Sequence, residues 1–86
     1  MMSTLTWERV KLLQAVYELS SKNEFGVVSI RDLIETLGRS RSAVAKQLIS
    51  LKKAGLVENP LRGYYRLTSV GEEVLNDFVK STRRGS

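Results

Sequence analysis

The chain has 86 residues and a formal net charge of +5; 42% of its residues are hydrophobic, 27% are charged, and none is cysteine or histidine. This length and composition are typical of one small globular domain. The missing residue types exclude disulfides, imidazole bases and the usual zinc ligands, and there is no glycine-rich phosphate loop, so we expect no catalytic site, metal or cofactor.

Residues 6–21 are predicted to form the first helix, with Thr6 as its N-cap. Apolar side chains recur at helical spacing, and neighbouring apolar residues widen the stripe to about half of the helix circumference. Its members are Leu5, Trp7, Val10, Leu12, Leu13, Val16, Tyr17 and Leu19. A helix in a small domain usually buries a narrower stripe, so the additional apolar surface of this helix must be covered by another apolar surface.

A short helix, a glycine turn and a longer helix follow. Ser29 opens a capping box with Asp32, which predicts a helix over about residues 30–37 after a short strand. Gly38 supplies its left-handed stop. The next helix, capped by Ser40 and closed by a second glycine, completes a helix-turn-helix unit.

Two short β-type segments, Leu56–Glu58 and Tyr64–Leu67, predict a β-hairpin. The residues between them, Asn59–Gly63, form a turn cluster that contains proline and glycine. Arg62 is therefore expected near the tip of the hairpin.

The last predicted element is a helix that begins at a capping box formed by Ser69 and Glu72 and runs to about Ser81. Residues 82–86 are expected to form a disordered basic tail. The single domain is thus predicted to cover residues 1–81.

The positive charge is concentrated in one segment. Residues 1–38 carry four Lys or Arg against five Asp or Glu, and residues 67–86 carry three against three. Residues 39–66, by contrast, carry seven Lys or Arg against one acid, Glu58. A localised basic patch of this kind is typical of a protein that binds a polyanion.

These elements, in this order, resemble the winged helix-turn-helix domain of prokaryotic transcription regulators, and they are similar to the MarR and PadR families. The resemblance is carried by Leu37-Gly38, Ser40 to Val44, Leu51 to Val57, Leu67-Thr68 and Gly71. It implies an α+β fold in which a three-helix core bears a β-hairpin wing and a C-terminal helix. It also implies a recognition helix at about residues 41–54, a wing at about 58–66, and double-stranded DNA as the partner.

MarR-type proteins have additional long helices that form a dimer and a ligand pocket. The 86 residues leave no room for such a pocket, so no small-molecule effector is implied.

Nine residues are predicted to contact DNA: Arg39, Ser40, Arg41, Ser42, Ala43, Lys46, Ser50, Lys53 and Arg62. The two arginines at the start of the recognition helix suit a backbone phosphate. Ser42 and Lys46 lie on the face opposite the apolar stripe and Ala43 lies beside that face, where all three suit base readout. Arg62 on the wing suits a phosphate or the minor groove.

The apolar excess of the first and last helices predicts a homodimer. Its predicted interface consists of Leu5, Trp7, Leu12, Leu19, Leu75 and Val79. The alternative is that the two helices only pack on each other.

We therefore predict a sequence-specific DNA-binding protein that acts as a transcriptional regulator. Two alternatives are a winged helix that serves as a protein-interaction module, and an RNA or single-strand binder that stacks bases on Tyr64 or Tyr65. When glycine is left out, no apolar run exceeds three residues, so we expect no membrane span and a place in the cytoplasm, in association with the nucleoid.

Overall fold

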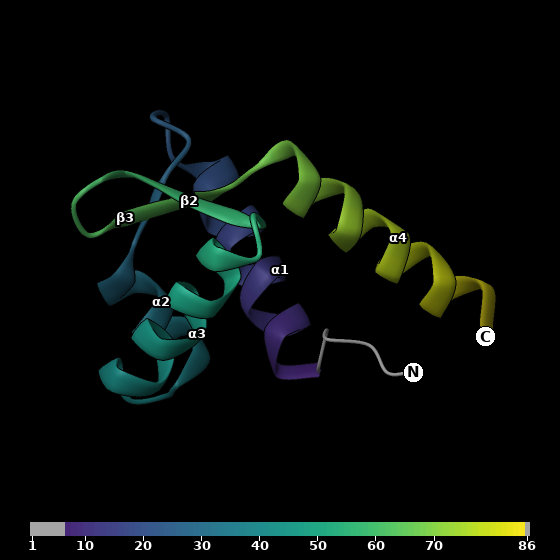
Figure 1. Cartoon of the computed structure of the whole chain (residues 1–86), viewed down its shortest axis with the longest axis horizontal. Helices are drawn as coiled ribbons and strands as arrows, with labels where there is room; N and C mark the ends of the chain where they lie inside the picture. The colour runs from purple at the N-terminus through teal and green to yellow at the C-terminus, as the bar shows by residue number, and fades with distance from the viewer. Residues whose placement is uncertain (1–6, 86) are drawn as a thin grey trace.

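The computed structural model describes the backbone of residues 7–85 and the side chains of residues 7–80 (Figure 1). Its elements are α1 (Trp7–Lys22), β1 (Val28–Ser29), α2 (Ile30–Leu37), α3 (Arg41–Lys53), β2 (Val57–Leu61), β3 (Tyr64–Leu67) and α4 (Ser69–Gly85). The strands form an antiparallel sheet in the order β1-β3-β2. This is the predicted α+β architecture. No helix in the described part of the chain is long and apolar enough to span a membrane.

Helix α1 occupies the centre of the fold. It contacts each of the other helices as well as β1 and β3. Leu12, Leu13 and Val16 of α1 are completely buried as a result. The central part of the wide apolar face of α1 is therefore covered from within the chain, whereas Trp7 and Tyr17 of the same face stay exposed.

This packing corrects part of the predicted dimer interface. Leu12 has no exposed surface, and Leu75 of α4 is only 5% exposed. Both side chains belong to the hydrophobic core of the single chain, so neither is available to a second copy. Leu5, predicted for the same interface, and Thr6, the predicted N-cap of α1, lie outside the described residues.

Both caps of α2 and the N-cap of α3 are those that the sequence predicts. The hydroxyl of Ser29 accepts a hydrogen bond from the backbone N–H of Asp32, at 3.2 Å. Gly38 adopts a left-handed conformation with φ of 66°, and its N–H donates to the carbonyl of Ile34. Ser40 then caps α3. The turn between the two helices is short because a left-handed glycine and an N-cap serine follow each other almost directly.

The prediction of a five-residue turn between the hairpin strands is wrong. β2 continues to Leu61, and only Arg62 and Gly63 lie between the strands. A register shift interrupts the pairing of β2 around Pro60, which has no N–H to donate. The side-chain amide of Asn59 braces this bulge by donating to the carbonyls of Leu61 and Tyr64, at 2.5 and 2.6 Å.

The turn of the hairpin is bonded to the first residue of the helix-turn-helix unit. The carbonyl of Gly63 accepts a hydrogen bond from the N–H of Ile30, the first residue of α2, at 3.0 Å. Glu58 and Arg66 face each other across the two strands and form an ion pair. The hydrogen bond between Ile30 and Gly63 holds the hairpin turn, and with it Arg62, beside the start of α2.

The N-cap of α4 differs from the predicted one. Thr68, not Ser69, caps the helix: its hydroxyl accepts from the N–H of Gly71 at 3.0 Å and donates to the carbonyl of Gly55 at 2.6 Å. The helix also continues to Gly85, four residues beyond the predicted end. Its C-terminal part extends away from the rest of the domain (Figure 1).

Candidate nucleic-acid interface

Helix α3 has one face in the core and the opposite face in solvent. The core face consists of Val44, Leu48 and Leu51, all with no exposed surface. Because these residues recur every three or four positions, the side chains half a turn away must point outward. The exposed residues on that side are Ser42, Lys46, Ile49 and Lys53.

Small side chains surround the start of α3. The hydroxyl of Ser40 accepts a hydrogen bond from the N–H of Ala43 at 3.2 Å, and it lies 3.4 Å from the hydroxyl of Ser42. Ser40, Arg41 and Ser42 are exposed, whereas Ala43 is half-buried. Between Arg39 and Val44, Arg41 is the only large side chain, so a close approach to this end of the helix meets mainly small side chains.

Within the basic segment 39–66, two arginines are paired with acids. Arg39 pairs with Glu8 of α1 at 3.3 Å, and Arg66 pairs with Glu58. The remaining cations are exposed and form no ion pair with any described residue; they are Arg41, Lys46, Lys52, Lys53 and Arg62. Their charge remains available to an external polyanion.

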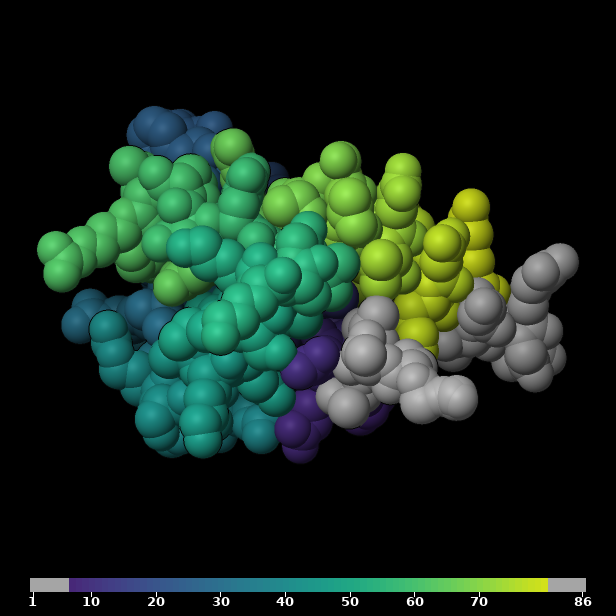
Figure 2. Space-filling view, viewed as in Figure 1, coloured from purple at the N-terminus to yellow at the C-terminus, as the bar shows by residue number. Residues whose placement is uncertain are grey.

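The exposed side of α3 and the hairpin adjoin one another. α3 contacts β2. Figure 2 shows the atoms of the hairpin next to those of α3 on the visible face, with the hairpin tip protruding at the left. We call this surface the basic face; its residues are Arg41, Ser42, Lys46, Ile49, Lys53 and Arg62. It combines a helix that fits a groove with a projecting cation beside it.

Two of the nine residues predicted to contact DNA form hydrogen bonds with side chains of α1. Arg39 is the partner of Glu8, and the half-buried hydroxyl of Ser50 accepts a hydrogen bond from Arg9 at 2.6 Å. These partners are 31 and 41 residues apart in sequence, so no local pattern could have revealed them.

Ile49 is a residue of the basic face that the predicted contacts omit. Its side chain is 55% exposed on the side of α3 that faces away from the core. The sequence does contain the relevant pattern, because Ile49 falls outside the apolar stripe of α3.

The remaining predicted dimer residues are partly accessible. Trp7 is 62% exposed, and its ring lies 6.1 Å from that of Phe78 at a tilt of 43°. Leu19 and Val79 are half-buried.

The described residues hold no group of three or more His, Cys, Asp or Glu side chains that could bind a metal ion.

No protein-family model matches the chain, and no curated protein matches it. The chain does match solved structures. It is 27% identical to IdeR of T. acidophilum, with a TM-score of 0.75 over 91% of this chain and 35% of that one. It is 19% identical to the reduced form of MarR from E. coli, with a TM-score of 0.76 over 86% of this chain and 51% of that one.

Both of these proteins are winged-helix transcription regulators. The predicted winged helix-turn-helix fold is thereby confirmed. The chain spans between about a third and a half of the length of these two solved structures.

Proposed function

We propose that the protein is a sequence-specific double-stranded DNA-binding protein that regulates transcription. The observation that carries this proposal is the basic face, where Arg41, Lys46 and Lys53 of α3 and Arg62 at the hairpin tip form no ion pair with any described residue. The fold supports it, since the structural neighbours are DNA-binding transcription regulators. The site of action is then the cytoplasm, in association with the nucleoid.

In this proposal α3 enters the major groove. An α-helix with its side chains is about 10–12 Å in diameter, and the major groove is about 12 Å wide, so the groove admits the 13 residues of α3. Lys46 lies at the middle of the exposed side, with Ser42 one turn before it, so its ammonium group can reach a base edge such as guanine O6 or N7. Arg62 lies on the hairpin, outside the groove that α3 occupies, and therefore meets a phosphate or the minor groove.

The test separates base readout from phosphate contact. Duplexes selected from a random pool supply a preferred site, and fluorescence anisotropy then measures each variant on the selected and on a random duplex at several salt concentrations. Lys46→Ala should cost about 1–3 kcal/mol on the selected duplex and little on the random one. Arg62→Ala should weaken both nearly equally and flatten the plot of log K against log salt by about one unit per protomer.

The matched control is Lys22→Ala, which removes an exposed cation at the end of α1 that lies outside the basic face. It should leave the selectivity for the preferred duplex unchanged. If Lys46→Ala and Arg62→Ala also leave duplex affinity unchanged, the basic face is only a solvated surface and the proposed function is wrong.

We also propose that the protein acts as a homodimer. The support is the exposed indole of Trp7, the half-buried Val79 and the extension of α4 away from the domain (Figure 1). A two-fold dimer would place two α3 helices about 34 Å apart, in successive major grooves of a pseudo-palindromic site. Light scattering at tens of micromolar protein, free and bound to duplex, measures this; a monomer under both conditions contradicts it.

One observation favours a second function, a winged helix that binds another protein. Phe25 is 75% exposed and Leu61 is 62% exposed, and together with Tyr64 they line a shared apolar hollow. Gel shifts with duplex DNA, single strands and RNA distinguish the possibilities. Binding to single strands or RNA in preference to duplex would favour base stacking on Tyr64, and no binding to any nucleic acid would favour the protein-interaction module.

A further inference from the structure

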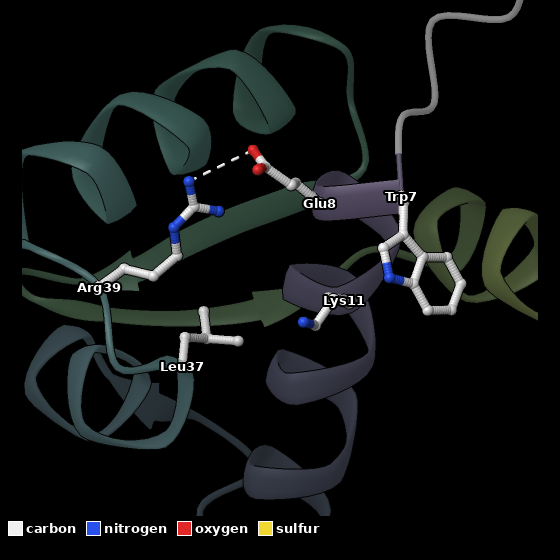
Figure 3. Close-up of a pocket in the computed structure, with 5 residues that line it drawn as sticks. All are labelled: Trp7, Glu8, Lys11, Leu37 and Arg39. Carbon is white, nitrogen blue, oxygen red and sulfur yellow. Dashed lines mark hydrogen bonds and ion pairs between the residues drawn. The ribbon is translucent and has the colours of Figure 1, made fainter.

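A hollow lies between α1 and the turn that connects α2 to α3. It has a volume of about 370 Å³ and is lined by Trp7, Glu8, Lys11, Leu37 and Arg39. Figure 3 shows Arg39 reaching from the turn toward Glu8 on α1, with a dashed line marking their ion pair. Lys11 lies three residues after Glu8 and hence on the same side of α1.

Glu8 is the acceptor at the centre of this arrangement. Its Oε1 atom accepts from a guanidinium nitrogen of Arg39 and from the amide nitrogen of Gln47, each at 3.3 Å. One carboxylate on α1 thus receives a charged donor from the α2–α3 turn and a neutral donor from α3.

The ion pair is in contact with solvent. The side chain of Glu8 is 59% exposed and that of Arg39 is 34% exposed. Exposed ion pairs of this kind contribute little to stability, so Arg39 can change partner readily. A carboxylate and a phosphate offer a guanidinium group the same acceptor chemistry.

We propose that this hollow is a further contact site for a DNA backbone phosphate, which replaces Glu8 as the partner of Arg39. Lys11 is the second cation of the site. The proposal rests on the proposed DNA-binding function. Arg39 directly precedes Ser40, the cap of α3, so a duplex that holds α3 in its major groove has a backbone strand close to this turn.

Glu8 then acts as an internal competitor of DNA. A duplex must displace the carboxylate before it gains the Arg39 contact, whatever its base sequence. Glu8 consequently weakens binding to all duplexes by a similar factor, and it lowers the number of counterions that binding releases.

The first test neutralises Glu8. Glu8→Gln keeps the shape of the side chain and should tighten binding to selected and random duplexes alike, by about two- to fivefold. The control is Glu18→Gln, which makes the same charge change at an exposed position further along α1. In an Arg39→Ala background the effect of Glu8→Gln should disappear. An effect of Glu8→Gln that equals that of Glu18→Gln, or that persists without Arg39, overturns the proposal.

The second test concerns Lys11. Lys11→Ala should reduce the slope of log K against log salt by about 0.9, the value expected for one lost phosphate contact. Lys22→Ala, on the same helix, should leave the slope unchanged. Equal slopes for wild type and Lys11→Ala remove Lys11 from the site.

A third measurement distinguishes a backbone phosphate from a free anion. Inorganic phosphate is added to the free protein at concentrations too low to weaken duplex binding. It should not raise the melting temperature of the protein in a way that depends on Arg39. Such a rise would identify the hollow as a free-anion site instead. If the wild type binds no duplex at all, the proposed function fails and this site fails with it. If it binds duplex but Glu8→Gln behaves like its control, only the phosphate exchange is wrong.

Discussion

Gly71, near the start of α4, lies against the backbone that precedes the hairpin. A Cβ atom at this position would lie 2.0 Å from the carbonyl oxygen of Leu56 and 2.9 Å from its carbonyl carbon. That oxygen accepts a hydrogen bond from the N–H of Thr68 at 3.0 Å. The carbonyl cannot turn away without weakening this bond, so Gly71→Ala should force α4 and the hairpin apart.

The expected magnitude follows from two opposing effects. Replacing glycine by alanine inside an exposed helix stabilises it by up to about 1 kcal/mol. Inserting a methyl group into a filled space costs typically about 1–3 kcal/mol, and here the obstacle is backbone rather than a flexible side chain. We expect the steric cost to lie at the upper end of this range, which leaves a net loss of about 2 kcal/mol in the free energy of unfolding. For a domain of this size, this corresponds to a fall in melting temperature of roughly 8–16 °C.

Urea unfolding followed by far-ultraviolet circular dichroism measures this change. The control is Asn76→Ala, at an exposed position of α4, which should raise stability by no more than about 0.7 kcal/mol. A Gly71→Ala variant as stable as the wild type would show that the start of α4 does not press on Leu56, and the reasoning would be refuted.

Two further predictions concern the hairpin and the basic face. Asn59→Ala removes both side-chain hydrogen bonds that brace the bulge of β2, so it should cost about 1–2 kcal/mol and speed amide exchange in the hairpin, with unchanged exchange contradicting it. Ile49→Ala should change stability by less than about 0.5 kcal/mol, because the side chain is 55% exposed, yet weaken binding to the selected duplex by about 1 kcal/mol in anisotropy titrations through loss of an apolar contact with a thymine methyl group. An equal loss on random duplex would contradict the second prediction.

The helix-turn-helix unit could be predicted from the sequence almost to the residue. Ser29, Gly38 and Ser40 each act through hydrogen bonds that reach only three or four residues along the chain. Such caps depend on local geometry, so the same residue types predict the same helix ends in most folds. The apolar stripe of α3 likewise determined which side of the helix would face the solvent.

Where the sequence allows two local structures for the same segment, it could not predict which of them forms. Thr68 and Ser69 are both good caps for α4, and the fold selects Thr68, whose hydroxyl also reaches the carbonyl of Gly55, 13 residues away. The extent of β2 is a similar case. A Pro60 in a turn-like stretch predicts a loop, but the amide of Asn59 satisfies hairpin carbonyls and lets the strand continue to Leu61.

The sequence by itself determined that α1 is apolar over half its circumference and that the positive charge is concentrated in residues 39–66. Only the tertiary structure decided what covers that apolar surface and which cations stay free. Leu12 is buried because other elements pack around α1, and Arg39 is paired because the same packing brings Glu8 to the α2–α3 turn. Burial and ion pairing join residues tens of positions apart, and the distance between such residues is set by the packing of whole elements, which no local pattern contains.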